Sequence, residues 1–182
     1  MSKIVACGAL AVHIQAIARR RGWDLEVRPL PAVMHNRPEQ IAPAVRAALT
    51  DDVVALGYAD CGTYGALDGI DLPRLHGDHC YDVFSRDEVR AALEEVPGTY
   101  FLTDFLARTF EHTVWRGLGL DRHPDLRDEY FRHYTRVLWL AQHPTPATRA
   151  AAAHAAERLE LPLEVREVGD DALERQLEAL LT

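Results

Sequence analysis

Short apolar segments alternate with segments of helical periodicity along most of the chain, and this alternation limits the folds that the chain can adopt. The clearest apolar segment is VVALGY at positions 53–58, a continuous run that is typical of a central parallel strand. The other predicted strands cover residues 3–6, 24–30, 72–75, 99–103, 136–141 and 163–168. Strands that alternate with helices in this way predict an α/β fold with a mostly parallel sheet, helices on both faces and a Rossmann-like three-layer architecture.

Helical segments fill the intervals between these strands. Apolar residues recur with a helical period from Leu10 to Ala18, and Gly22 ends the pattern. Ser85 is a suitable N-cap for a later helix, and Glu88 completes a capping box three residues on. The other predicted helices cover residues 38–49, 86–95, 147–159 and a terminal segment that Asp170 caps.

Residues 104–134 form the one segment that resembles an insertion in this pattern. They are predicted to form two helices, with a break between Gly117 and Pro124. Their many aromatic and aliphatic side chains provide enough apolar area to cover a pocket, so we expect this segment to act as a lid. No linker of biased composition and no repeat divides the 182 residues, and residues 1–182 are therefore predicted to form a single α/β domain.

Composition and charge exclude several classes of protein. The net charge of −8 argues against a nucleic-acid binder, which would present a basic surface. No apolar stretch reaches the roughly 18 residues that a membrane span requires. The first residues, MSKIVACGAL, lack the charged and apolar regions of a signal peptide. We therefore expect a cytoplasmic protein with no nucleic-acid or membrane partner.

Cys7, Cys61 and Cys80 each follow a predicted strand. Because the carboxyl ends of parallel strands meet at one edge of a sheet, we expect the three sulfurs to converge. Gly8 and Gly62 directly follow two of them and let the backbone pass close to a bulky group. Three thiolates at one point can bind zinc together with a histidine, or a [4Fe-4S] cluster with one iron open to substrate. The alternative is that the cysteines are small, inert core residues.

Three histidines lie near the same predicted edge. His79 is adjacent to Cys80, and His76 and His143 also follow predicted strands. Each is a candidate for a further metal ligand, because neutral imidazole and thiolate share zinc sites.

Three other polar residues are candidates for a catalytic role. Asp60 and Asp78 can act as acid, as base or as the hydrogen-bond partner of a ligand histidine, and turn formation explains both equally well. Arg74 can bind an anionic substrate group with two parallel hydrogen bonds. The chain has no phosphate loop, no GxGxxG and no GxSxG, so nucleotide-driven and serine-hydrolase chemistry lack support.

Four segments resemble the pattern of a known family. They are CGAL at 7–10, GYADCGTYG at 57–65, LPRLHGDHCYDVF at 72–84 and PGTYFLTDF at 97–105. In this order they resemble the uncharacterised domain-of-unknown-function 1638 family, and the resemblance extends from residue 1 to about residue 145. Between His76 and Cys80 the chain departs from the family's pattern by what looks like a short insertion. The resemblance implies an α/β protein of bacteria and archaea that is often encoded beside corrinoid-dependent methyltransferase systems.

These observations support two main predictions of function. In the first, the three cysteines bind one metal centre that acts on a small thiol, methyl or sulfur-bearing substrate in corrinoid-linked one-carbon metabolism. In the second, the chain is a non-catalytic metal- or corrinoid-binding accessory protein, and its partner is a corrinoid or methyltransferase protein. A closed site with four ligands would favour the second. A third possibility is a metal-free binding module with three inert thiols.

Overall fold

The computed structural model describes residues 1–181 and has the elements of an α/β protein. The strands of the described residues form two parallel three-stranded sheets, in the orders β2-β1-β3 and β4-β5-β6. The predicted α/β class and the parallel pairing are confirmed. The chain divides into two compact units, Met1–Phe84 with the segment from Asp170, and Ser85–Gly169. That the two units fold as a single domain stays a prediction.

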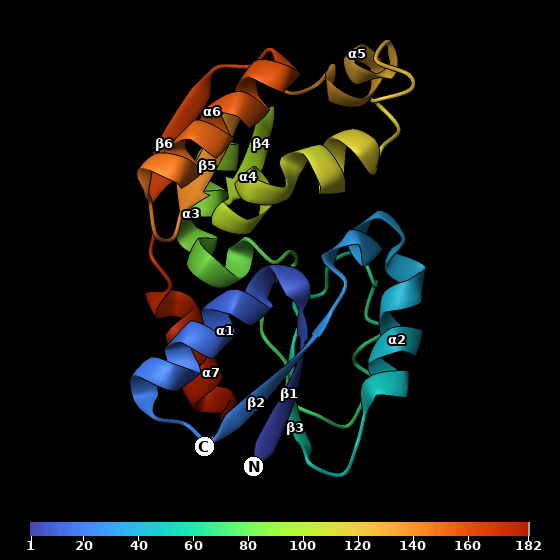
Figure 1. Ribbon diagram of the computed structural model, residues 1–182, viewed down its shortest axis with the longest axis vertical. Coiled ribbons are helices and arrows are strands. Elements are labelled where there is room, and N and C mark those ends of the chain that lie inside the picture. The colour runs from blue at the N-terminus through green and yellow to red at the C-terminus, as the bar shows by residue number, and fades with distance from the viewer. Residues whose placement is uncertain (182) are drawn as a thin grey trace. The chain divides into compact units, whose positions relative to one another are not determined.

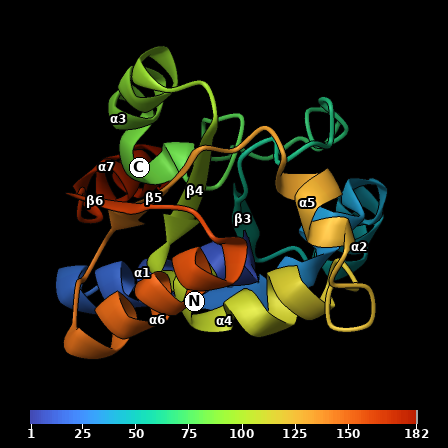
Figure 2. The ribbon, with the colours of Figure 1, turned by 90° about the horizontal axis from the view of Figure 1, so that it is seen from above.

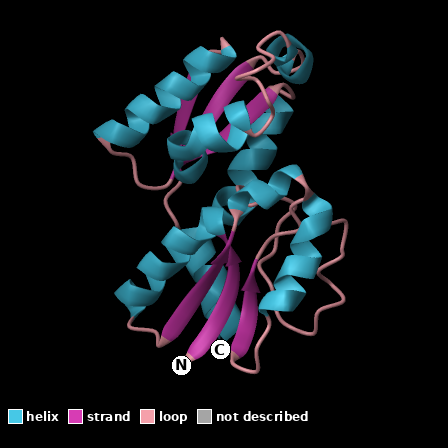
Figure 3. Cartoon of the chain, turned by 45° about the vertical axis from the view of Figure 1, so that its right-hand side comes forward, coloured by secondary structure: helices cyan, strands magenta, loops and turns pink. Residues whose placement is uncertain are grey.

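The first unit is built around the sheet β2-β1-β3. Figures 1 and 3 show helices α1 and α7 on one face of this sheet and α2 on the other. Ile4, Val5 and Ala55 are fully buried in the core of this unit, as expected for strands that are covered on both faces. The elements are β1 (Ser2–Cys7), α1 (Gly8–Arg21), β2 (Leu25–Leu30), η1 (Ala32–Asn36), η2 (Pro38–Gln40), α2 (Ile41–Ala48), β3 (Val53–Gly57) and α7 (Asp171–Leu181).

The first sheet ends at β3 because another segment occupies the outer edge of that strand. The backbone N–H of Leu56 donates to Pro73 O at 2.8 Å, and the N–H of Leu75 donates to Leu56 O at 3.2 Å. The predicted strand at residues 72–75 is thereby reduced to one bridge, between Leu56 and Arg74. At the opposite edge, β2 contains Pro29, which has no N–H to donate and is suited to an edge strand.

The second unit is built around the sheet β4-β5-β6. Figure 2 shows α4 and α6 on one face of this sheet and α3 on the other. A kink at Ser85, where φ is −165° and ψ is 89°, interrupts α3. This extended backbone is that of an N-cap, the role predicted for Ser85. The elements are α3 (Asp82–Glu95), β4 (Thr99–Thr103), α4 (Asp104–Phe110), η3 (Glu111–Arg116), α5 (Leu126–Phe131), β5 (Arg136–Ala141), α6 (Pro146–Leu159) and β6 (Leu163–Glu167).

Residues 104–134 are helical and broken, as predicted, and belong to the second unit. The segment η3 is a π-helical turn, a type of turn that is often found at functional sites. Phe110, Trp115 and Phe131 are buried in the same apolar cluster as Trp139 of β5. Packing inside the second unit thus explains these aromatic residues, and the lid role stays a prediction.

No helix within residues 1–181 combines the length and the apolar character that crossing a membrane requires. The cytoplasmic location stays a prediction.

Candidate metal centre

The carboxyl ends of the three strands in the first unit lie at the same edge of the sheet. Cys7, the last residue of β1, pairs with Leu30, the last residue of β2. Ala6 pairs with Gly57, the last residue of β3. The loops that follow β2 and β3 therefore begin beside Cys7, and the upper ends of the strands in Figure 3 mark this edge.

Four side chains form a cluster at this edge. Cys61 Sγ lies 3.1 Å from Cys80 Sγ, and Cys80 Sγ lies 3.4 Å from His35 Nε2. Cys7 Sγ lies 3.9 Å from the same His35 nitrogen. One ligand atom from each of Cys7, His35 and Cys80 lies within 4.8 Å of the other two, so these three residues can hold a metal ion. The structure thus brings the three sulfurs together and adds a histidine.

Cys7 is held at the N-terminus of α1. It is the N-cap of that helix, and its sulfur accepts a hydrogen bond from Ala9 N–H at 3.4 Å. The amide groups and the dipole at a helix N-terminus favour a thiolate over a thiol. Cys7 is fully buried, so its sulfur is available only to the other members of the cluster.

His35 comes from η1, the short helical turn that follows β2. Its Nδ1 lies 2.8 Å from Ala32 O, a contact in which this nitrogen donates. Nε2 then faces the sulfurs, and a histidine that donates one ring N–H to a carbonyl is typically oriented for binding a metal through the other nitrogen. The half-buried His35 is thus oriented by its own turn.

Gly8 permits the close approach of this turn to Cys7. A Cβ at position 8 would lie 2.9 Å from Leu30 O and 3.3 Å from Ala32 N, both of them backbone atoms that cannot move aside alone. Any other residue at position 8 would therefore displace the segment that carries His35.

Gly8→Ala should weaken metal binding at this cluster about tenfold, the size of loss expected when the support of a ligand is disturbed. Helix propensity alone would make this substitution stabilising. Gly69→Ala is the matched control, because a Cβ there would meet only Arg46 Nη2 at 3.8 Å, an ordinary contact. Competition titrations on both variants with a divalent metal test this prediction, and equal affinities would refute it.

Backbone hydrogen bonds hold the loops of Cys61 and Cys80 against each other. Cys61 N–H donates to Asp78 O at 2.8 Å, and Asp60 N–H donates to Gly77 O at 2.9 Å. Cys61 has a φ of 52°, an uncommon value for a residue with a side chain, and Gly62 follows with a φ of 79°. The sulfur of Cys61 thus reaches Cys80 from a tightly constrained turn.

Asp60 stabilises the turn around Cys61. Its carboxylate accepts hydrogen bonds from Thr63 Oγ1 at 3.0 Å, Tyr64 N–H at 3.1 Å and Gly65 N–H at 2.8 Å. Burial opposes ionisation, but these bonds outweigh it and hold the pKa of Asp60 below its usual range. Turn formation thus accounts for this aspartate, and an acid or base role stays a prediction.

Asp82 stabilises the turn around Cys80 in the same way. Its Oδ2 accepts hydrogen bonds from the backbone N–H groups of Asp78 and His79, both at 2.9 Å. The side chain of His79 lies 3.8 Å from the same carboxylate and stacks on Tyr81, with the ring centroids 4.8 Å apart. The neighbouring carboxylate of Asp82 raises the pKa of His79 against the effect of burial.

The side chains of the cluster shift one another's pKa values. The hydrogen bond from Cys80 lowers the pKa of Cys61 to about 6 and lowers the pKa of Cys7 as well, in both cases against the effect of burial. The neighbouring sulfurs of Cys61 and Cys7 raise the pKa of Cys80 well above the usual range, and burial adds to this shift. Burial alone would lower the pKa of His35, but Cys61 and Cys7 outweigh it and raise it to about 11. These shifts favour the thiolate form of Cys61 and Cys7, the thiol form of Cys80 and the imidazolium form of His35.

The comparison with protein families agrees with the resemblance seen in the sequence. The family model described as "Protein of unknown function (DUF1638)" matches residues 29–177. The chain belongs to the DUF1638 family. The matched part of this DUF1638 protein contains His35, Cys61 and Cys80, whereas Cys7 precedes it. No curated protein and no solved structure matches the chain.

His35 is the member of the cluster that sequence reasoning missed. It follows the end of β2 by five residues, so the rule that singled out the cysteines applies to it equally. The candidate histidines lie elsewhere in the DUF1638 chain. His76 and His79 are exposed, and neither belongs to the group of ligand atoms that joins Cys7 to Cys80 in the described residues.

The other candidates have structural partners. Arg74 donates through Nε and Nη2 to Asp68 Oδ1 at 3.0 and 2.7 Å. His143 follows β5 in the second unit, where its backbone N–H donates at 2.8 Å to the buried carboxylate of Asp104. Asp78, an exposed residue, contributes its carbonyl to Cys61. Functional roles for Arg74, Asp78 and His143 stay predictions.

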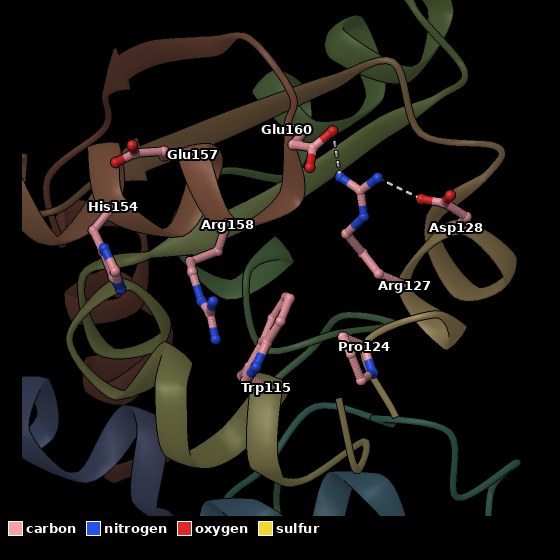
Figure 4. A pocket seen from close by; sticks show the side chains of 8 residues that line it. All are labelled: Trp115, Pro124, Arg127, Asp128, His154, Glu157, Arg158 and Glu160. Atoms are coloured by element: carbon pink, nitrogen blue, oxygen red, sulfur yellow. Dashed lines mark hydrogen bonds and ion pairs between the residues drawn. The ribbon is translucent and has the colours of Figure 1, made fainter. Parts of the chain in front are cut away.

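A second candidate site is a hollow of about 480 Å³ in the second unit of this DUF1638 protein. The guanidinium of Arg158 lies over the ring of Trp115, 3.6 Å from its centroid, and its Nε donates to Glu111 at 2.9 Å. Figure 4 shows Arg127 between Glu160 and Asp128, with an ion pair to each. Because a carboxylate neutralises each guanidinium, the hollow offers no clear anion site. Its lining is Trp115, Pro124, Arg127, Asp128, His154, Glu157, Arg158 and Glu160.

Proposed function

We propose that this protein binds a single zinc ion through Cys7, His35 and Cys80. The observation that carries the proposal is the convergence of one ligand atom from each of these residues to within 4.8 Å of the other two. Ligands at about 2.0–2.3 Å from a tetrahedral zinc lie roughly 3.5–4 Å apart. The distances of 3.4 Å from Cys80 Sγ and 3.9 Å from Cys7 Sγ to His35 Nε2 fit that spacing closely.

The presence of His35 favours zinc over an iron–sulfur cluster. Thiolate and imidazole together are the usual ligands of zinc, whereas four thiolates are the usual ligands of a [4Fe-4S] cluster. A cluster would also spread its thiolates around several iron atoms, but Cys61 Sγ and Cys80 Sγ are only 3.1 Å apart. A compact set of donors is better suited to one ion.

Three protein ligands leave the fourth position of a tetrahedral zinc for a small molecule, which is the arrangement of catalytic zinc sites. Zinc in such a site lowers the pKa of a bound thiol and so supplies a nucleophile at neutral pH. Tyr58, which is buried beside the cluster, remains a neutral phenol, because burial and the thiolates of the cluster raise its pKa. We propose a small thiol or methylated sulfur compound as the substrate, and a corrinoid or methyltransferase protein as the partner that the family resemblance suggests.

One observation favours the second candidate, a non-catalytic metal-binding accessory protein. Cys61 Sγ lies 3.1 Å from Cys80 Sγ, close enough for a small movement to bring Cys61 onto the metal. Four protein ligands would close the site, as in structural zinc sites.

Substitution with cobalt(II) tests both candidates. Purified protein should contain one zinc per chain, and the cobalt form should show the absorption of tetrahedral thiolate ligation. Adding a short alkyl thiol should change that spectrum if the fourth position is open. An unchanged spectrum, together with a changed one in Cys61→Ser, would indicate the closed site. A brown protein that absorbs near about 400 nm would indicate a cluster, and a protein that takes up no metal would refute the proposal.

A further inference from the structure

Cys61 and Cys80 form a pair that zinc binding through Cys7, His35 and Cys80 does not explain. Their sulfurs are 3.1 Å apart, closer than the 3.4 Å that separates Cys80 Sγ from His35 Nε2. A disulfide has an S–S distance of about 2.05 Å, so a shift of roughly 1 Å would join them. Both are free cysteines in the structure.

The backbone keeps the two residues in this arrangement. The hydrogen bonds from Cys61 N–H to Asp78 O and from Asp60 N–H to Gly77 O join the two loops immediately beside the sulfurs. The carboxylates of Asp60 and Asp82 each hold one of the two turns. Because the fold already orders both loops, little further conformational entropy is lost when the two sulfurs join.

We infer that Cys61 and Cys80 are a site of reversible oxidation, at which a hydroperoxide converts the metal-free pair to a disulfide that excludes zinc. One sulfur attacks the O–O bond of hydrogen peroxide and becomes a sulfenic acid, with release of water. The other sulfur then attacks the sulfenic sulfur and releases a second water. In total, two thiols and one peroxide give one disulfide and two waters. Cys80 is half-buried, whereas Cys61 is buried.

Oxidation and zinc binding compete for Cys80. A sulfur within a disulfide has no thiolate to give to a metal, so the oxidised chain retains only Cys7 and His35 of the proposed ligands. This competition rests on the proposed function, whereas formation of the disulfide in the metal-free chain does not. Cys61 is then the residue that makes the site sensitive to oxidants.

The test treats the full, metal-free chain with equimolar hydrogen peroxide. Of the three thiols, one should remain titratable in denaturant, the mass should fall by two hydrogen atoms, and peptide mapping should join Cys61 to Cys80. A thiol reductant should restore all three. Cys7→Ser should still form the disulfide, and Cys61→Ser should form none within the chain. Three remaining thiols, or a bridge that contains Cys7, would overturn the inference.

The same reaction on zinc-loaded protein tests the competition. Zinc should slow the loss of thiols at least about tenfold, because binding occupies Cys80. Equal rates with and without bound zinc would refute the competition. A chain that forms the disulfide but binds no zinc would refute the proposed zinc site and leave the oxidation site standing.

Discussion

Cys80→Ser should weaken zinc binding at least about 100-fold. Removing only the hydrogen-bond partner of a ligand typically costs roughly 10–100-fold, so removing the ligand itself should cost more. Serine is nearly the same size, but its hydroxyl stays protonated at neutral pH and provides neither the charge nor the soft donor of a thiolate. The measurement is a competition titration against a chromogenic chelator, with the melting temperature recorded with and without zinc.

Cys61→Ser is the matched control for this variant. The two sulfurs are neighbours at 3.1 Å, but Cys61 is outside the group formed by Cys7, His35 and Cys80, so its variant should keep one zinc per chain. Joint loss of zinc in all three cysteine variants, which the strand-end positions alone predict, would instead make Cys61 a fourth ligand. Cys80→Ser with unchanged zinc affinity and a stability loss of about 1–3 kcal/mol would identify Cys80 as a core residue.

Periodicity predicted the class of fold because most of the central strands and the longer helices bury an apolar face. All residues of β3 except Val54 are buried, and Ser85 has the extended backbone of a cap. The division into two sheets was not predictable in the same way. It depends on the backbone hydrogen bonds of Leu56 and Leu75, which occupy the edge of β3. The apolar pattern of residues 72–75 is the same whether they form a full strand or a single β-bridge, so the sequence does not distinguish the two.

The candidate site was predictable where a residue ends or follows a strand. Cys7 ends β1 and Cys61 lies four residues beyond the end of β3, and the parallel register brings both to one edge. Cys80 lies in a loop that two backbone hydrogen bonds hold against the loop of Cys61. The positions of the strands alone do not predict this contact between the loops. His35 lies in a short turn five residues beyond β2, a position to which the same rule applies, and the close approach at Gly8 lets that turn lie beside Cys7.

Zinc affinity should rise about 100-fold for each pH unit between roughly pH 6.5 and 8, because binding releases about two protons. In the metal-free chain His35 is protonated, since Cys61 and Cys7 raise its pKa to about 11. Cys80 is also protonated, since its pKa is raised well above the usual range. Cys7 is already a thiolate and releases none. Both protons leave when zinc binds, so a higher pH favours the bound form.

His35→Ala should lower zinc affinity at every pH and should also halve this dependence on pH. The variant lacks one of the two protons to be displaced, so its affinity should rise only about tenfold per pH unit. His76→Ala is the control, because that exposed histidine contributes only its backbone N–H, to Gln176 at 2.8 Å. Chelator competition at a series of pH values measures the slopes. If the unsubstituted protein and His35→Ala show the same slope of log zinc affinity against pH, His35 is neutral before zinc binds. The prediction of an imidazolium in the metal-free cluster would then be wrong.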